Sequence, residues 1–168
     1  FNGLLAFQLI IINGVLLSIN LDNGHQLFSV FLTAQLIVLL IFLLFNFPIA
    51  KIFMGDGGAY LFGSFTSLNV ITTNNLNPEI SSFFFCIILF YLFFEVFFSF
   101  IRKTIQKKSP IKPDRFHLHM LSYKFVKLKF SVKDCNYLNS LVVNFTYSLL
   151  VLPSFFIKEN GLLCKYWF

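Results

Sequence analysis

The sequence has few charged residues for its length. Only 12% of its 168 residues are charged, whereas a typical soluble domain has about 25%. Hydrophobic residues make up 57%, phenylalanine alone occupies 26 positions, and the mean hydropathy is +0.78. A soluble domain needs more polar groups to cover its surface, and a disordered chain needs a more polar composition still. The composition therefore excludes both classes and predicts a membrane protein.

Cysteine is also scarce. The three cysteines, Cys86, Cys135 and Cys164, lie far apart and match no metal or disulfide spacing, which excludes a disulfide-stapled secreted domain. The chain opens at Phe1 inside an apolar run without a basic region, so its start does not resemble a signal peptide. We expect this chain to be the C-terminal part of a longer protein.

Long apolar runs predict α-helices that cross the membrane. A spanning helix needs about 20 apolar residues, and runs of this length lack the alternation of a strand. The third run is weaker because serine, threonine and asparagine dilute it. The fourth contains Glu95, for which we favour a structural role near the end of the span. We predict a single all-α polytopic membrane domain, 1–168, with about five transmembrane helices, at 4–20, 27–45, 59–76, 80–101 and 138–157.

Basic residues gather in two loops, residues 46–58 and 102–137. Alternation of five spans puts both loops on the side of the chain start, and 11 of the 13 Lys and Arg residues fall there. The positive-inside rule assigns that side to the cytoplasm. The net charge of +6 therefore reflects topology, and no nucleic-acid partner is expected. We interpret the basic amphipathic segment 124–133 as a surface segment on anionic lipid headgroups.

The first loop ends in a glycine-rich turn around Asp56, immediately before the third span. Gly55, Gly57 and Gly58 allow a tight turn and a close approach of the backbone to a ligand. A carboxylate there suits a hard cation such as Mg²⁺, which prefers oxygen ligands and phosphate oxygens. Aspartate is also a common helix N-cap, and the spacing alone leaves both interpretations open.

The second loop carries two histidines, His117 and His119, close to Arg115. Such groups could contact a phosphate or form a solvated basic turn, and charge alone leaves these two interpretations open. They could also bind a transition metal, which is the weaker interpretation because no third histidine or cysteine lies nearby.

Three segments, at residues 1–4, 46–63 and 109–120, resemble motifs of the polyprenyl-phosphate N-acetylhexosamine-1-phosphate transferases, glycosyltransferase family 4, and they occur in the same order as in that family. The stretch NFPIAKIFMGDGGAYLFG, residues 46–63, resembles the family's segment around its Mg²⁺-binding aspartate. SPIKPDRFHLHM, residues 109–120, resembles its histidine motif, and FNGL, residues 1–4, resembles the tail of its DG-x-x-GL motif. The form DRFHLH is closer to the GlcNAc-1-phosphate transferases than to the phospho-N-acetylmuramoyl-pentapeptide transferases, although Met120 stands where many relatives have a further histidine.

The resemblance implies a function. Members transfer a sugar 1-phosphate from a UDP-N-acetylhexosamine to undecaprenyl or another polyprenyl phosphate and release UMP, in cell-envelope synthesis of polysaccharides such as O-antigen lipopolysaccharide. Asp56 and His117 would be catalytic, and Asp56 would bind Mg²⁺, with Mn²⁺ as the alternative ion. Five residues would bind the uridine, sugar and phosphates: Asn2, Asn46, Phe53, Arg115 and His119.

The resemblance further implies a multi-pass protein of the bacterial inner membrane with a cytoplasmic active site. Its Phe-rich lipid-facing surface is compatible with a homodimer. The family also uses aspartates upstream of FNGL, so we expect the 168 residues alone to be inactive. The alternatives are a non-enzymatic membrane subunit or transporter fragment and a simple membrane anchor. Transporters usually place ionisable groups near the membrane midplane, whereas here they gather at the predicted cytoplasmic boundary.

Overall fold

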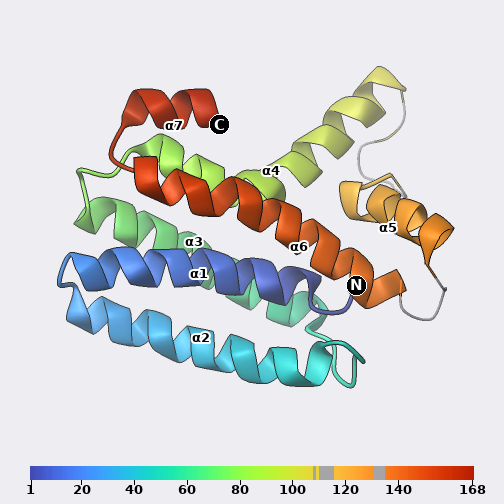
Figure 1. The fold of residues 1–168 in the computed structure, drawn as a ribbon, viewed down its shortest axis with the longest axis horizontal. Coiled ribbons are helices and arrows are strands. Elements are labelled where there is room, and N and C mark those ends of the chain that lie inside the picture. The colour runs from blue at the N-terminus through green and yellow to red at the C-terminus, as the bar shows by residue number, and fades with distance from the viewer. Residues whose placement is uncertain (108, 110–115, 131–134) are drawn as a thin grey trace.

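The computed structural model describes residues 1–107, 109, 116–130 and 135–168, and every regular element in these ranges is a helix (Figure 1). Three shorter helices accompany five long ones. The long helices are α1 (Leu4–Asp22), α2 (Gln26–Asn46), α3 (Gly55–Leu76), α4 (Ser82–Ile105) and α6 (Cys135–Ser154). The shorter ones are α5 (Leu118–Lys129), the 3-10 helix η1 (Phe155–Ile157) and α7 (Gly161–Trp167).

Each of the five apolar runs coincides with a long helix, and the all-α membrane fold is confirmed. Within the described ranges, four helices are long and apolar enough to cross a membrane, namely α1, α2, α4 and α6. The helix α3 has 22 residues, which is long enough, but it is not among the four because of its many polar residues. Of the five predicted spans, four are therefore confirmed as long and apolar enough to cross a membrane, and the remaining one, α3, is long enough but too polar to qualify.

The polar residues of α3 face the other helices. Asn69 Nδ2 donates hydrogen bonds to Asn13 Oδ1 of α1 at 2.7 Å and to Gln35 Oε1 of α2 at 2.8 Å. One turn further along, Thr73 Oγ1 accepts a hydrogen bond of 2.9 Å from Asn20 of α1. All five side chains are buried. The residues that make α3 a weak span by composition are therefore enclosed by protein, where polar side chains are tolerated in a membrane bundle.

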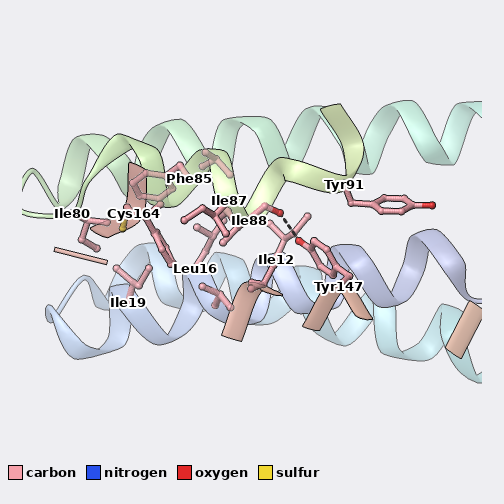
Figure 2. Packing of buried hydrophobic residues seen from close by; sticks show 14 of the residues in the cluster. Ile12, Leu16, Ile19, Ile80, Phe85, Ile87, Ile88, Tyr91, Tyr147 and Cys164 are labelled. Carbon is pink, nitrogen blue, oxygen red and sulfur yellow. Dashed lines mark hydrogen bonds between the residues drawn. The ribbon is translucent and has the colours of Figure 1, made fainter. Parts of the chain in front are cut away.

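The centre of the bundle is α1, which packs against α2, α3 and α6. Ile12, Leu16 and Ile19 of this helix are fully buried in the apolar cluster of Figure 2. In the same cluster, the hydroxyl of Tyr147 in α6 donates a hydrogen bond to the carbonyl of Ile88 in α4. Close packing of this kind holds helices together in lipid, where burial of apolar surface provides little force.

The elements that carry the predicted site meet at one end of the bundle. In Figure 1 the chain start, the connection from α2 to α3, α5 and the beginning of α6 all lie at the right-hand end. The last part of α4 projects beyond the bundle at the same end and lies above α5 in this view. The described parts of the two basic loops therefore share one end with the chain start, as the alternation of helices requires.

Candidate active site

Glu95 of α4 points its carboxylate at the start of α5. The side chain is only 12% exposed, and it accepts a hydrogen bond of 2.9 Å from the hydroxyl of Tyr91, one turn earlier. Its Oε2 accepts from the backbone N–H of Leu118 at 3.2 Å, and its Oε1 from that of His119 at 3.1 Å. These two N–H groups belong to the first turn of α5 and have no partner inside the helix. Glu95 therefore caps α5 from a different helix.

The same carboxylate holds both histidines of the motif. His117 Nδ1 lies 3.0 Å from Glu95 Oε2, and His119 Nδ1 lies 2.9 Å from Glu95 Oε1. A carboxylate can only accept, so each Nδ1 donates its proton. The two rings stack with centroids 5.5 Å apart and planes 8° apart. One buried charge thus fixes the orientation of two imidazoles.

This arrangement leaves the other nitrogen of each ring available. No described residue is hydrogen-bonded to Nε2 of His117 or His119, and the side chains are 32% and 25% exposed. A protonated imidazole donates from Nε2 to an anion, whereas a neutral one with its proton on Nδ1 accepts a proton there. The pair is therefore suited to contact phosphate oxygens or to move a proton.

The carbonyl of His119 anchors α5 to α6. Asn139 Nδ2 donates to this carbonyl at 2.9 Å, and Asn139 Oδ1 accepts a short hydrogen bond from the hydroxyl of Ser122. Asn139 is fully buried. The histidine segment is therefore held on two sides, by Glu95 of α4 and by Asn139 of α6.

Asn46 ties the end of α2 to the chain start. Its Oδ1 accepts a hydrogen bond of 2.6 Å from the backbone N–H of Gly3, and its Nδ2 donates to the carbonyl of Ile52 at 2.7 Å. Asn46 is 6% exposed. Both ends of its amide are thus used inside the protein, and the residue shapes the loop that carries Phe53. Its predicted contact with uridine stays a prediction.

Aromatic and amide contacts join the chain start to the histidine segment. The ring of Phe1 packs edge-on against His119 with centroids 5.3 Å apart. Asn2 Nδ2 donates to the carbonyl of Pro48 at 2.7 Å, and Asn2 Oδ1 accepts from Asn136 of α6 at 3.2 Å. The structure therefore brings together three of the predicted site segments, at residues 1–4, 46–54 and 117–119.

Asp56 lies in the first turn of α3, and Phe53 lies in the loop before it. Phe53 is 78% exposed, so its ring is free to stack on a planar ligand. Asp56 is exposed, and the N-cap position of α3 is Met54, without a side-chain cap hydrogen bond. The alternative of Asp56 as the N-cap is therefore wrong. A negative charge at this position is still favoured by the helix dipole.

The described side chains fit a Mg²⁺ ion only in part. They contain no group of three or more His, Cys, Asp or Glu residues that could enclose a metal. Mg²⁺ commonly uses one or two carboxylates together with substrate phosphates and water. Asp56, exposed and without a hydrogen bond from any described residue, fits that pattern as a single protein ligand. Magnesium binding by Asp56 therefore stays a prediction.

Arg115, a predicted substrate-binding residue, lies outside the described residues. Sequence reasoning assigned Glu95 a structural role, and it did not identify Asn136 or Asn139 at all. The available signal for Glu95 was its position as an acidic residue inside an apolar run, followed 22 and 24 residues later by the two histidines. Ionisable residues within such runs mark functional sites by default.

Comparison with known proteins identifies relatives of the chain. The family model described as Glycosyl transferase family 4 matches residues 1–74. The chain is 32% identical over 130 residues to the undecaprenyl-phosphate alpha-N-acetylglucosaminyl 1-phosphate transferase of Thermotoga maritima. This match covers 76% of the chain and 37% of the relative, so the chain spans little more than a third of that protein's length. No solved structure matches the chain.

Proposed function

The chain belongs to glycosyl transferase family 4, and from this premise we propose that the whole protein transfers a sugar 1-phosphate from a UDP-N-acetylhexosamine to a polyprenyl phosphate and releases UMP. The relative from Thermotoga maritima is named for an undecaprenyl-phosphate acceptor and an N-acetylglucosaminyl 1-phosphate group. The product would enter synthesis of a cell-envelope polysaccharide such as O-antigen lipopolysaccharide. The protein would act in the bacterial inner membrane with its active site on the cytoplasmic face.

The observation that carries the proposal is the histidine pair held by Glu95. Both Nδ1 atoms lie within 3.0 Å of one carboxylate, and no described residue is bonded to either Nε2. Transfer between two phosphates demands neutralisation and positioning of anions more than covalent chemistry. Two oriented imidazoles at the same end of the bundle as the loop that carries Phe53 would supply that positioning (Figure 1).

The reaction exchanges one phosphorus–oxygen bond for another. An oxygen of the polyprenyl phosphate attacks the β-phosphorus of the UDP-sugar and forms a new bond to it. The bond from that phosphorus to the oxygen bridging the two phosphates breaks, and UMP leaves with the electron pair. His117 and His119 donate hydrogen bonds to phosphate oxygens as their charge develops, which lowers the barrier. Phe53 stacks on the uracil, and Asn2 lies beside the base or the sugar.

An apolar cavity next to the histidine segment supports a lipid acceptor. It has a volume of about 470 Å³ and lies between α4, α5 and α6, where its walls include Phe90, Phe125, Val142 and Leu150. Tyr91 and Leu118, which both bond to Glu95, also line it. A prenyl chain in this cavity would bring its phosphate to the histidines without leaving the apolar layer.

Asp56 would hold Mg²⁺, or Mn²⁺ in its place. When bound, the ion would neutralise the donor diphosphate and the leaving UMP. The carboxylate has no hydrogen bond from a described residue that would have to break first. Because Asp56 and the histidines lie at the same end of the bundle (Figure 1), Asp56 would hold the diphosphate on the side of the protein where His117 and His119 lie.

The proposal is tested with the full-length protein in lipid. The assay is exchange of labelled UMP into UDP-N-acetylglucosamine in the presence of polyprenyl phosphate, with and without Mg²⁺. His117→Ala and Asp56→Asn should each lower exchange by about a hundredfold or more, the usual scale for loss of a group that stabilises transition-state charge. Exchange at the wild-type rate in either variant would refute the assigned role.

Matched controls lie at the other end of the bundle. His25, whose Nε2 contacts the carbonyl of Leu76 at 3.2 Å, is the control for His117. Asp22, the last residue of α1, is the control for Asp56. His25→Ala and Asp22→Asn should both keep the wild-type rate of exchange.

A further inference from the structure

The helix α5 carries an apolar stripe that the described residues leave largely exposed. Leu128 is 85% exposed, Phe125 60% and Leu121 39%, whereas Val126, on the other side of the helix, is 5% exposed and packed inward. Spacing of three and four residues places Leu121, Phe125 and Leu128 on one side of an α-helix. A stripe of this kind on a helix without acidic residues requires a partner or a bilayer.

Two lysines border the apolar stripe. By helical spacing Lys124 lies beside Leu128 on one edge, and Lys129 lies beside Phe125 on the other. Lys129 Nζ lies 5.1 Å from the centre of the Phe125 ring, and Lys124 Nζ lies 4.9 Å from that of Phe116. Residues 116–130 contain no aspartate or glutamate. The stripe and its border therefore match an anionic lipid surface, with apolar side chains among the acyl chains and ammonium groups at the phosphates.

The stripe is continuous with the lipid-facing surface of the bundle. Leu121 and Phe125 line the apolar cavity together with Val142 and Leu150 of α6. Val142 and Leu150 are themselves exposed, on a helix long and apolar enough to cross the membrane. A bilayer around α6 therefore reaches the exposed side of α5, which favours lipid over a soluble protein as the partner.

We propose that α5 lies on anionic phospholipid headgroups through this stripe and its two lysines, and that the lipid surface thereby holds His117 and His119 against Glu95. His117 is the N-cap residue of α5 and His119 lies in its first turn, so a shift of the helix moves both rings. The described contacts on the rest of the helix are with Glu95 of α4, with Asn139 and its neighbours on α6, and with Phe1, and none of them holds the exposed stripe itself. The role of the histidines rests on the proposed function, whereas the contact of α5 with lipid does not.

The test is hydrogen–deuterium exchange of the full-length protein in nanodiscs. One lipid composition is phosphatidylcholine alone, and the other contains about one third phosphatidylglycerol. Backbone amides of α5 should exchange about tenfold more slowly in the anionic discs, the order expected for two lysines at a charged surface. Lys124→Gln/Lys129→Gln should abolish this difference. Lys158→Gln/Lys165→Gln, which removes the same charge at the opposite end of the bundle, should preserve it.

Equal exchange of α5 in both lipid compositions would overturn the proposal, as would loss of the difference in the control pair. High salt provides a second measurement that needs no variant, because it should remove the protection of the wild-type helix in anionic discs. No substrate enters either experiment. Lipid-dependent protection in a protein without transferase activity would therefore refute the proposed function and leave the lipid contact intact.

Discussion

The carboxylate of Glu95 lies 2.9 Å from Nδ1 of His119, and this contact joins two helices across 24 residues of sequence. The same carboxylate binds the backbone N–H of His119 at 3.1 Å. Side chain and backbone of one histidine are thus fixed by a group on α4. We infer that Glu95 is a positioning residue that acts through the histidines, without contacting the substrate itself.

Replacement of Glu95 by glutamine should lower the turnover number by about tenfold to a hundredfold. Glutamine keeps the shape but loses the charge, and charge-assisted hydrogen bonds are worth about 1.5–3 kcal/mol each. The amide nitrogen of the glutamine can only donate, so it would leave one imidazole Nδ1–H without an acceptor. The Michaelis constant for the UDP-sugar should change less, because Phe53 and Asn2 are untouched. Steady-state kinetics of full-length protein in lipid separates the two constants.

Glu79 provides the control for this substitution. It accepts a hydrogen bond of 2.9 Å from Asn23 at the opposite end of the bundle. Glu79→Gln should leave both constants unchanged. A wild-type turnover number in Glu95→Gln would show that the carboxylate does not orient the histidines.

The apolar runs predicted the long helices well, because a run of about 20 apolar residues in a membrane satisfies its backbone hydrogen bonds as a helix. The predicted span 27–45 corresponds to α2, Gln26–Asn46. The sequence places residues 118–129 within the predicted loop 102–137, where only 124–133 is interpreted as an amphipathic surface segment. Residues 118–129 become α5 through contacts that the sequence does not display, namely capping by Glu95 and packing on α6.

The candidate site was only partly predictable for the same reason. Asp56, His117 and His119 stand out by residue type and spacing as candidates, and the family resemblance implies their roles. The role of Glu95 depends on the contact between α4 and α5. The role of Asn139 depends on the contact between α5 and α6. Such contacts between distant segments cannot be derived from local patterns in one sequence.

Gly3 should not tolerate a side chain. Its φ is +76°, a left-handed conformation that costs a non-glycine residue about 1–2 kcal/mol, and an added Cβ would lie 3.0 Å from the ring of Phe47. Gly3→Ala should therefore lower the free energy of unfolding by at least about 1–2 kcal/mol. It should also weaken the hydrogen bond to Asn46. Unfolding of the detergent-solubilised full-length protein by sodium dodecyl sulfate measures the change.

Gly14 offers a matched comparison. It lies in the middle of α1, and an added Cβ would meet nothing within 4 Å. Alanine is the better helix former by about 1 kcal/mol, so Gly14→Ala should be neutral or stabilising. Equal destabilisation by both substitutions would contradict the interpretation that conformation and crowding at Gly3 are what matter.

Cys164 should react slowly with thiol reagents at neutral pH. Burial raises the pKa of its thiol, because the thiolate is poorly solvated in α7, where Cys164 is fully buried. Only the thiolate is a nucleophile, so alkylation should accelerate as the pH rises toward the raised pKa. Mass spectrometry after brief treatment with iodoacetamide at several pH values measures the modified fraction. Protein unfolded in denaturant provides the reference for fast alkylation. Alkylation of the folded protein at that rate at neutral pH would contradict the prediction.

Filling the cavity between α4, α5 and α6 should weaken binding of the lipid acceptor. Thr146 lines this cavity, and among the described residues its hydroxyl bonds only to the carbonyl of Val142 in its own helix. Thr146→Phe should raise the Michaelis constant for polyprenyl phosphate severalfold and leave that for the UDP-sugar unchanged, because only the prenyl chain would use this space. Thr33 of α2 forms the equivalent bond to Ser29 and is also exposed, so Thr33→Phe is the control and should change neither constant. An equal rise for both substrates in Thr146→Phe would mean that the substitution disturbs the histidines and not an acceptor site.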